Sequence, residues 1–190
     1  MTNNTQRVLD YFRRQTLASK RTLEGVFIPA NLDSVRDGFE FLIDKGILDT
    51  RRVFCDAGSG DGRIVALASG GYGIPSFGVE CDPELVIKSR ENLKRLGMSD
   101  TVPIAEGDFV SDGTYESVNR RFEQVEIFFN YWSGERKIAS KIAMQSLRGT
   151  LFLLLYNREY TPSPSFDGLH HEETLNITKS RDAILGVYRK

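Results

Sequence analysis

From Arg52 to the C-terminus, short apolar runs alternate with segments that have helical spacing. This alternation constrains the fold because strands joined by helical crossovers form a parallel sheet with helices on both faces. The runs that we predict to be strands are 52–56, 76–80, 102–108, 124–130 and 151–157. The segments that we predict to be helices start at Gly62 and span 82–97, 114–122 and 134–147. The sequence therefore predicts an α/β fold.

The two ends of the chain depart from this pattern. Residues 171–180 and 182–190 have strand character and are separated by a short turn near Ser180–Asp182. They predict an antiparallel pair that closes the sheet. The first 50 residues hold two segments with apolar residues at helical spacing, 4–17 and 31–48. These segments predict a helical N-terminal extension.

Three glycines follow the first apolar run, in "CDAGSGDGR" (55–63). Each glycine within an element costs roughly 0.5–1 kcal/mol relative to alanine, so Gly58, Gly60 and Gly62 need a reason. In an open parallel sheet, ligands bind beyond the carboxyl ends of the strands, and a glycine turn lets a ligand approach the backbone and the free amides of the next helix. The alternative is a tight strand-to-helix turn that binds no ligand.

The residues of this turn do not fit a phosphate-binding loop. Arg63 stands where the third glycine of a dinucleotide fingerprint should be, and no Gly-Lys-Ser/Thr follows. Asp56 and Asp61 flank the turn, and their charges would repel a pyrophosphate but attract a cation. A nicotinamide-dependent reductase is therefore the weaker alternative.

Residues Asp56 to Gly62 resemble the D/E-x-G-x-G-x-G motif of class I S-adenosylmethionine-dependent methyltransferases. The resemblance implies a Rossmann-like sheet, mostly parallel with an antiparallel terminal strand. It also implies S-adenosylmethionine as the cofactor, and its sulfonium and ammonium groups would suit an acidic surround. The cofactor-binding residues that it implies in this turn are Asp56, Gly58, Ser59, Gly60 and Gly62.

Further cofactor-binding residues follow from the same resemblance at two more strand ends. Glu80 ends the second strand, where the family's acidic residue accepts hydrogen bonds from the ribose hydroxyls. Asp108 ends the third strand and would meet the adenine amino group, with Phe109 packed on the adenine ring and Cys81 lining its pocket. Glu80 could instead only precede a helix capped by Asp82, and Phe109 and Cys81 could be core residues.

The fourth strand ends in "FFNYWSG" (128–134), where substrate meets the methyl group in this family. The resemblance makes Asn130 and Tyr131 the candidate catalytic residues, and Asn130 also a candidate for binding the cofactor's amino-acid end. The alternative is that Asn130 only satisfies backbone groups at the strand end. The stretch lacks the Asn/Asp-Pro-Pro-Tyr/Phe of enzymes that methylate amino groups of nucleic acids or glutamine.

Residues 56–69 and 78–97 are most similar to small protein-lysine methyltransferases, namely the archaeal broad-specificity enzymes and the mitochondrial ATP-synthase c-subunit enzymes. This similarity implies a protein as the first candidate acceptor. A lysine ammonium must lose a proton from a pKa of about 10.4, and desolvation beside aromatic side chains would lower that pKa. The candidate aromatic walls are Tyr131, Trp132 and Tyr160. The alternatives are a small metabolite or RNA as acceptor, or a non-catalytic module that binds S-adenosylmethionine.

The composition of the chain limits which binding partners we expect. The chain has 25 Lys and Arg against 26 Asp and Glu, a net charge of −1, which disfavours nucleic acid as the main partner but leaves it open. Its two histidines, His170 and His171, are adjacent and lack the spacing of metal ligands, so we expect no metal and regard them as surface or strand residues.

The remaining expectations concern location and organisation. Two cysteines are too few for a disulfide framework, and neither a signal peptide nor a run of ~20 apolar residues is present. We therefore expect a cytoplasmic protein that does not enter membranes. We also expect one methyltransferase domain over 1–190, with a helical segment at 1–50 and the cofactor-binding α/β core at 51–190.

Overall fold

The computed structural model of this chain describes residues 3–15, 19–22, 25–157, 165–177 and 183–190. Its centre is a seven-stranded sheet in the order β5-β4-β3-β6-β7-β9-β8. The strands are β3 (Phe54–Ala57), β4 (Ser76–Glu80), β5 (Ile104–Glu106), β6 (Ile127–Tyr131), β7 (Leu151–Asn157), β8 (His170–Ile177) and β9 (Ala183–Arg189). The pairs among β3 to β7 are parallel, whereas β9 is antiparallel to both of its neighbours.

The predicted α/β fold and its antiparallel final strand are confirmed. The final strand, however, lies inside the sheet between β7 and β8 rather than at its edge. Burial explains this order, because the middle of β9 is buried throughout, whereas most of β8 is exposed or half-buried. The turn predicted near Ser180–Asp182 lies outside the described residues.

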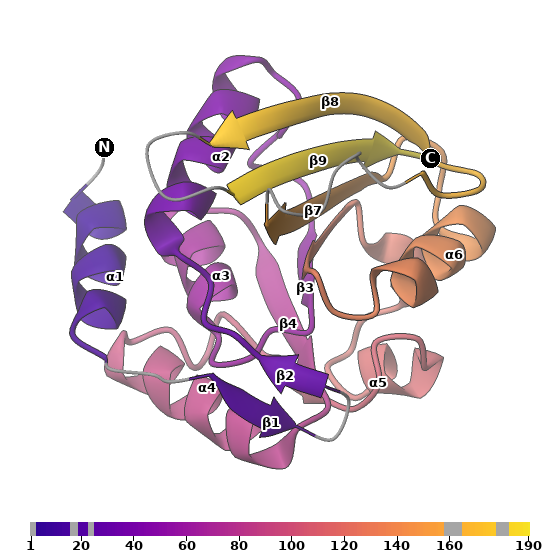
Figure 1. Cartoon of the computed structure of the whole chain (residues 1–190). Coiled ribbons are helices and arrows are strands. Elements are labelled where there is room, and N and C mark those ends of the chain that lie inside the picture. Colours follow the sequence, from indigo (N-terminus) through magenta and orange to yellow (C-terminus); the bar gives the residue numbers. More distant parts are fainter. Residues whose placement is uncertain (1–2, 16–18, 23–24, 158–164, 178–182) are drawn as a thin grey trace.

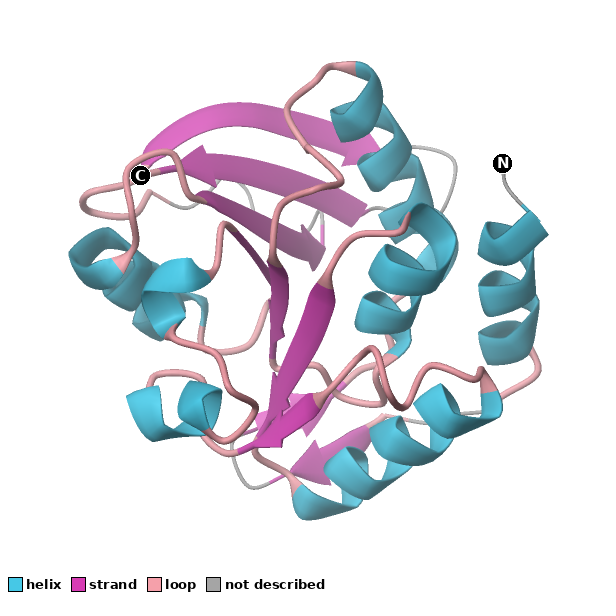
Figure 2. Ribbon diagram, turned by 180° about the vertical axis from the view of Figure 1, so that it is seen from behind, coloured by secondary structure: helices cyan, strands magenta, loops and turns pink. Residues whose placement is uncertain are grey.

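Helices cover both faces of the sheet, as Figures 1 and 2 show, with α1 to α4 on one face and α5 and α6 on the other. The helices are α1 (Asn3–Arg13), α2 (Leu32–Asp44), α3 (Arg63–Ala66) with its π-helical continuation η1 (Leu67–Gly71), α4 (Pro83–Arg95), α5 (Asp112–Glu116), the 3-10 helix η2 (Phe122–Gln124) and α6 (Glu135–Gln145). The predicted helix at 114–122 is shorter than expected. The chain leaves helical geometry at Asn119, which has a φ of 55°.

Local caps set the ends of two helices. Asn31 accepts hydrogen bonds from the amides of Asp33 and Ser34 at the start of α2. Asp82 caps α4 in the same way and is followed by Pro83 at the first helical position, as the sequence predicts. Within the described residues, none of the helices has the length and apolar character needed to cross a membrane.

A two-stranded antiparallel hairpin was not predicted. It consists of β1 (Lys20–Thr22) and β2 (Gly25–Phe27), with Lys20 paired to Phe27. Each strand has only three residues, too few for a clear alternation of apolar and polar side chains. Figure 1 shows the hairpin beside α4, near the carboxyl ends of the central strands.

The order of the strands fixes where a ligand would bind. From β3 the chain builds outward through β4 to β5, and it then returns to the other side of β3 with β6 and β7. The point at which the order reverses therefore lies between β3 and β6. Ligands of open parallel sheets bind beyond the carboxyl ends of the strands at such a point.

Candidate functional site

The turn that follows β3 requires its glycines. Gly58, Gly60 and Gly62 have φ values of 90°, 54° and 80°, a region that side chains with a Cβ atom rarely adopt. The amides of Gly58 and Ser59 both donate to the carbonyl of Val79 at 2.9 Å. The turn is therefore held rigidly against the end of β4.

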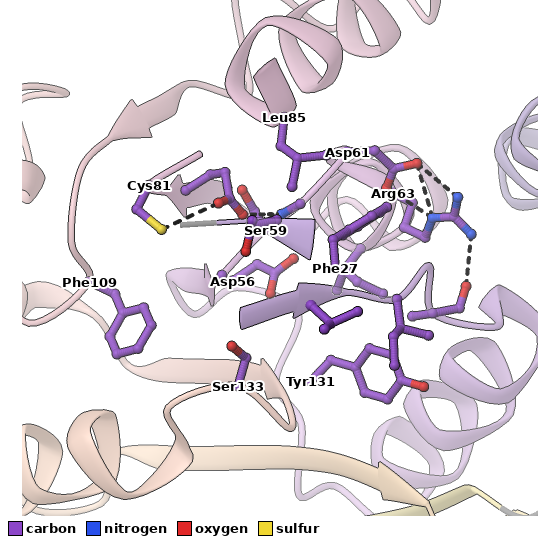
Figure 3. Close-up of a pocket in the computed structure, with 18 residues that line it drawn as sticks. Phe27, Asp56, Ser59, Asp61, Arg63, Cys81, Leu85, Phe109, Tyr131 and Ser133 are labelled. Atoms are coloured by element: carbon purple, nitrogen blue, oxygen red, sulfur yellow. Dashed lines mark hydrogen bonds and ion pairs between the residues drawn. The ribbon is translucent and has the colours of Figure 1, made fainter. Parts of the chain in front are cut away.

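A cavity of about 80 Å³ opens above this turn. Its walls are the glycine turn, the end of β4, the β1–β2 hairpin, Phe109 and the end of β6, as Figure 3 shows. The carboxyl groups in its lining are those of Asp56, Asp61 and Glu80, and the basic side chain in its lining is that of Arg63. The walls thus carry more carboxylates than cations.

Glu80 joins the two strand ends that form the cavity floor. Its Oε2 accepts from the amide of Gly60 at 2.7 Å, and its Oε1 accepts from the amide of Asp82 at 2.9 Å. The thiol of Cys81 lies 3.7 Å from Oε1. A carboxylate offers about four acceptor positions, so Glu80 can fix the turn and still accept hydrogen bonds from a ligand.

Asp56 presents an unpartnered oxygen to the cavity. The residue is only 1% exposed, and among the described residues its Oδ2 has no hydrogen-bond partner. Burial, followed by the charges of Glu80 and Asp61, raises the pKa of this carboxyl well above its usual range. A buried, unsatisfied acid in a cavity is a candidate ligand contact, because a cation there would restore its charged form.

Asp61 differs from Asp56, although both flank the turn. Asp61 is fully buried and forms an ion pair with Arg63, with 2.8 Å between Oδ2 and Nη2. Arg63 also donates from Nη1 to the carbonyl of Ala30 at 2.9 Å. The charge of Asp61 is thus neutralised within the protein, which leaves Asp56 and Glu80 to face a ligand.

Similarity to known proteins is found at the level of structure. No protein-family model matches the chain, and no curated protein matches it. The chain is similar to an RNA methyltransferase from Salinibacter ruber in complex with S-adenosyl-L-homocysteine, at 24% identity over 85% of this chain and 93% of that chain, with a TM-score of 0.64. The strand order, the glycine turn and this similarity agree. The chain has the class I methyltransferase fold.

Two further solved structures share this methyltransferase fold. A variant of MtNAS in complex with S-adenosylmethionine is 16% identical over 83% of this chain, with a TM-score of 0.66, and the match spans 61% of that longer chain. Geranyl diphosphate methyltransferase in complex with SAM is 13% identical over 83% of this chain and 85% of that chain, with a TM-score of 0.58.

Asn130 lies at the switch point of the methyltransferase fold and is fully buried. Its Nδ2 donates to the carbonyls of Ala57 at 2.6 Å and Ser133 at 2.9 Å, and its Oδ1 accepts from the amide of Ser133 at 3.1 Å. The side chain therefore ties the end of β3 to the loop that follows β6. Both donors and the oxygen are engaged with backbone, as in the alternative given for this residue above.

At the end of β6, Tyr131 and Ser133 line the cavity, whereas Trp132 does not. Burial raises the pKa of the Tyr131 hydroxyl. Trp132 has a φ of 43° and stacks on Tyr156, with 5.4 Å between ring centroids. Tyr160, the third aromatic residue suggested as a wall, lies outside the described residues.

The other predicted cofactor-binding residues occupy different positions. Ser59, Cys81 and Phe109 line the cavity. Gly62 instead allows close packing of helices, since an added Cβ would lie 3.0 Å from the Cβ of Ser89 on α4. Asp108 is exposed, and its Oδ1 accepts from the amide of Val110 at 3.0 Å.

Phe27 and Gly134 contribute to the site without having been predicted. Phe27 reaches the cavity from the hairpin, and nothing in its local sequence indicates this. Gly134 has a φ of 65°, and an added Cβ there would lie 2.7 Å from Phe109. Gly134 comes three residues after β6 ends at Tyr131, and a glycine between a strand and a helix is a sequence sign of a positive φ or of a close approach.

The two histidines lie on β8 and are exposed, as predicted. In the part of the chain that the structure describes, no group of three or more potential metal-binding side chains is found.

Proposed function

We propose that this protein is an S-adenosylmethionine-dependent methyltransferase. The observation that carries the proposal is the pair of carboxyl groups at the ends of β3 and β4, Asp56 and Glu80. Both line one cavity, and the Oδ2 of Asp56 has no hydrogen-bond partner among the described residues. S-adenosylmethionine has ribose hydroxyls that need hydrogen-bond acceptors and an ammonium that needs an anion. Glu80 and Asp56 offer these groups beside the glycine turn, where the ligand can approach the backbone.

Each residue has a distinct task in this proposal. Glu80 accepts hydrogen bonds from the ribose hydroxyls while it holds the Gly60 amide at 2.7 Å. Asp56 pairs with the ammonium of the amino-acid end. Cys81 and Phe109 border the adenine ring in this proposal. Asp108, an exposed residue outside the cavity lining, accepts a hydrogen bond from the amino group of that ring.

Methyl transfer requires little acid–base catalysis by residues of the protein. When bound, S-adenosylmethionine supplies a methyl carbon activated by its sulfonium, so an acceptor needs a lone pair aligned with that carbon. Tyr131 forms the wall on the acceptor side, and burial raises the pKa of its hydroxyl further above neutral pH. Asn130 positions the loop after β6 through its three bonds to backbone, and so acts through that loop.

Protein lysine is the acceptor that we favour within this class. Tyr131 lines the cavity and offers an aromatic wall to a lysine side chain. The guanidinium of Arg63 in the lining is already paired with Asp61, so it offers little attraction to the phosphates of a nucleic acid. The resemblance of residues 56–69 and 78–97 to protein-lysine methyltransferases supports the same acceptor. RNA is the second candidate, because the Salinibacter ruber protein is an RNA methyltransferase with similar chain length.

Two experiments test the proposal in sequence. A thermal-shift comparison of S-adenosylmethionine, S-adenosylhomocysteine and NAD should show stabilisation by the first two alone. A radiolabelled methyl-transfer screen of cell extract, with protease-treated and nuclease-treated samples, should then place the label in protein. The Glu80→Gln variant keeps the shape of the side chain but removes its charge. It should therefore show a smaller thermal shift with S-adenosylmethionine than wild type does.

Each result has a defined meaning. Stabilisation by NAD alone would overturn the cofactor. Label that is lost on nuclease treatment would replace lysine with RNA, and label in small molecules would replace it with a metabolite. Cofactor binding without transfer to any pool would mean a non-catalytic module.

A further inference from the structure

The ring of Phe27 lies directly on the glycine turn. A Cβ built on Gly60 would lie 2.4 Å from Cε2 of Phe27 and 2.9 Å from its Cδ2. Ordinary contacts of a Cβ atom are longer than about 3.4 Å, so the ring fills the space above the Gly60 backbone. A ligand that approaches this backbone needs the same space. Figure 3 draws Phe27 among the residues that line the cavity, together with Asp61 and Arg63.

The cavity is small because the hairpin closes it. Pockets that bind molecules of cofactor size have volumes of roughly 300–1,000 Å³, and this cavity has about 80 Å³. The floor is held to the end of β4, since the amides of Gly58 and Ser59 both donate to the carbonyl of Val79. The opposite wall is the two-stranded hairpin, and two-stranded hairpins depend for their stability on contacts with the rest of the protein. The contacts that hold the hairpin therefore decide whether this wall stays closed.

Two sets of contacts hold the hairpin over the cavity. At β1, Nζ of Lys20 lies 3.4 Å from Oδ1 of Asp82 and also pairs with the carboxylate of Glu84. Beyond β2, the carbonyl of Ala30 accepts from Arg63, which is itself paired with the buried Asp61. The contact at Ala30 is with a buried ion pair, whereas those of Lys20 are near the surface and more easily broken.

Three apolar residues of this segment, Val26, Phe27 and Ile28, line the cavity. Val26 and Ile28 are 55% and 53% exposed. Phe27 is half-buried, and its ring is the one that lies on Gly60. Displacing the hairpin uncovers this ring and breaks the contacts of Lys20, while the anchor at Ala30 stays in place.

We propose that the β1–β2 hairpin is the gate of the cofactor site, with Phe27 as its plug and Lys20 as its latch. The gate rests on the proposed function in so far as the ligand is an adenosyl cofactor. Binding then requires opening, and the apparent affinity is reduced by the fraction of molecules that are open. Weakening the plug or the latch should raise that fraction and speed association.

The test is the association rate of S-adenosylhomocysteine, measured by surface plasmon resonance on the full chain. Phe27→Ala should raise this rate at least about fivefold, with Phe27→Leu between it and wild type, because the open fraction rises as the ring shrinks. Lys20→Met should raise it about two- to fivefold, the scale of a surface ion pair. Arg21→Met is the matched control, since it removes the same charge from the exposed neighbour on β1, and its rate should stay at that of wild type.

Other outcomes would overturn the gate. A Phe27→Ala variant with an unchanged association rate and faster dissociation would make Phe27 a wall of the bound cofactor. Equal rates in Lys20→Met and Arg21→Met would remove the latch, and this comparison stands even if Phe27→Ala fails to fold.

Failure of the proposed function gives a different pattern. If wild type and all variants fail to bind both S-adenosylhomocysteine and S-adenosylmethionine, the cofactor is wrong and the gate falls with it. If wild type fails to bind but Phe27→Ala binds, the cofactor is right and the gate is strongly closed.

Discussion

Replacing Asp56 with asparagine should stabilise the free protein and weaken its binding of S-adenosylmethionine. Asparagine keeps the size of the side chain but removes its charge. The carboxyl is buried, its Oδ2 has no partner among the described residues, and it lies near the charges of Glu80 and Asp61. Each of these features disfavours a charge at this position in the absence of a cation.

The effect on stability follows from the raised pKa of Asp56. Since the folded protein holds this proton more tightly than the unfolded chain, the free energy of unfolding falls as the pH rises above about 3.9, the usual pKa of aspartate. The fall continues until the pH passes the folded-state pKa. The Asp56→Asn variant lacks this loss, so its free energy of unfolding at pH 7 should exceed that of wild type.

The effect on binding has the opposite sign. A charge-assisted hydrogen bond contributes about 1.5–3 kcal/mol, so its loss should weaken affinity for S-adenosylmethionine roughly ten- to a hundredfold. Because the cation binds the ionised carboxyl, the affinity of wild type should also rise with pH up to the folded-state pKa of Asp56. Calorimetry across pH 5–8 should show that dependence in wild type and a flatter one in the variant.

Asp61→Asn is the matched control, since it makes the same chemical change in the same turn. It leaves the guanidinium of Arg63, which is 11% exposed, without its charged partner, and breaking a fully buried pair costs about 3–5 kcal/mol, an upper figure for this pair. Urea unfolding should therefore show the two variants moving in opposite directions. If Asp56→Asn is less stable than wild type and binds S-adenosylmethionine equally well, Asp56 is a structural residue and its proposed role is wrong.

Three further predictions concern other parts of the site. Glu80→Gln should lower affinity for S-adenosylmethionine about ten- to a hundredfold by calorimetry, and unchanged affinity would remove Glu80 from the cofactor site. Gly62→Ala should destabilise the fold by about 1–3 kcal/mol through backbone strain and its contact with Ser89. Gly46→Ala, which has a positive φ but open space around it, reports the strain alone, so equal losses in urea unfolding would contradict the contact. Asn130→Ala should lower turnover at least about tenfold while cofactor affinity changes far less, and turnover within about twofold of wild type would end its positioning role.

The fold could be read from the sequence because its determinants are local. The run 151–156 is apolar on both faces, and the caps at Asn31 and Asp82 depend on residues two or three positions away. The strands of the β1–β2 hairpin could not be predicted, because three residues are too few to show an alternation of apolar and polar side chains. The inner position of β9 likewise depends on burial along the whole sheet.

The sequence by itself determined the glycine turn and the acid at the end of β4. A chain at φ values of 54° to 90° admits little but glycine, and strand ends follow from the pattern of apolar runs. Only the tertiary structure decided which side chains face the cavity. Asp56 and Asp61 look alike in the sequence, yet Arg63 neutralises one of them and leaves the other unpartnered. Gly62 accommodates Ser89, and Gly60 lies under Phe27, a residue from a hairpin far away in the chain. The backbone conformation of a turn depends on residues next to it in the sequence, so the sequence can reveal it. The group that pairs with a buried charge, or that packs on an exposed stretch of backbone, comes from segments that meet only when the chain has folded.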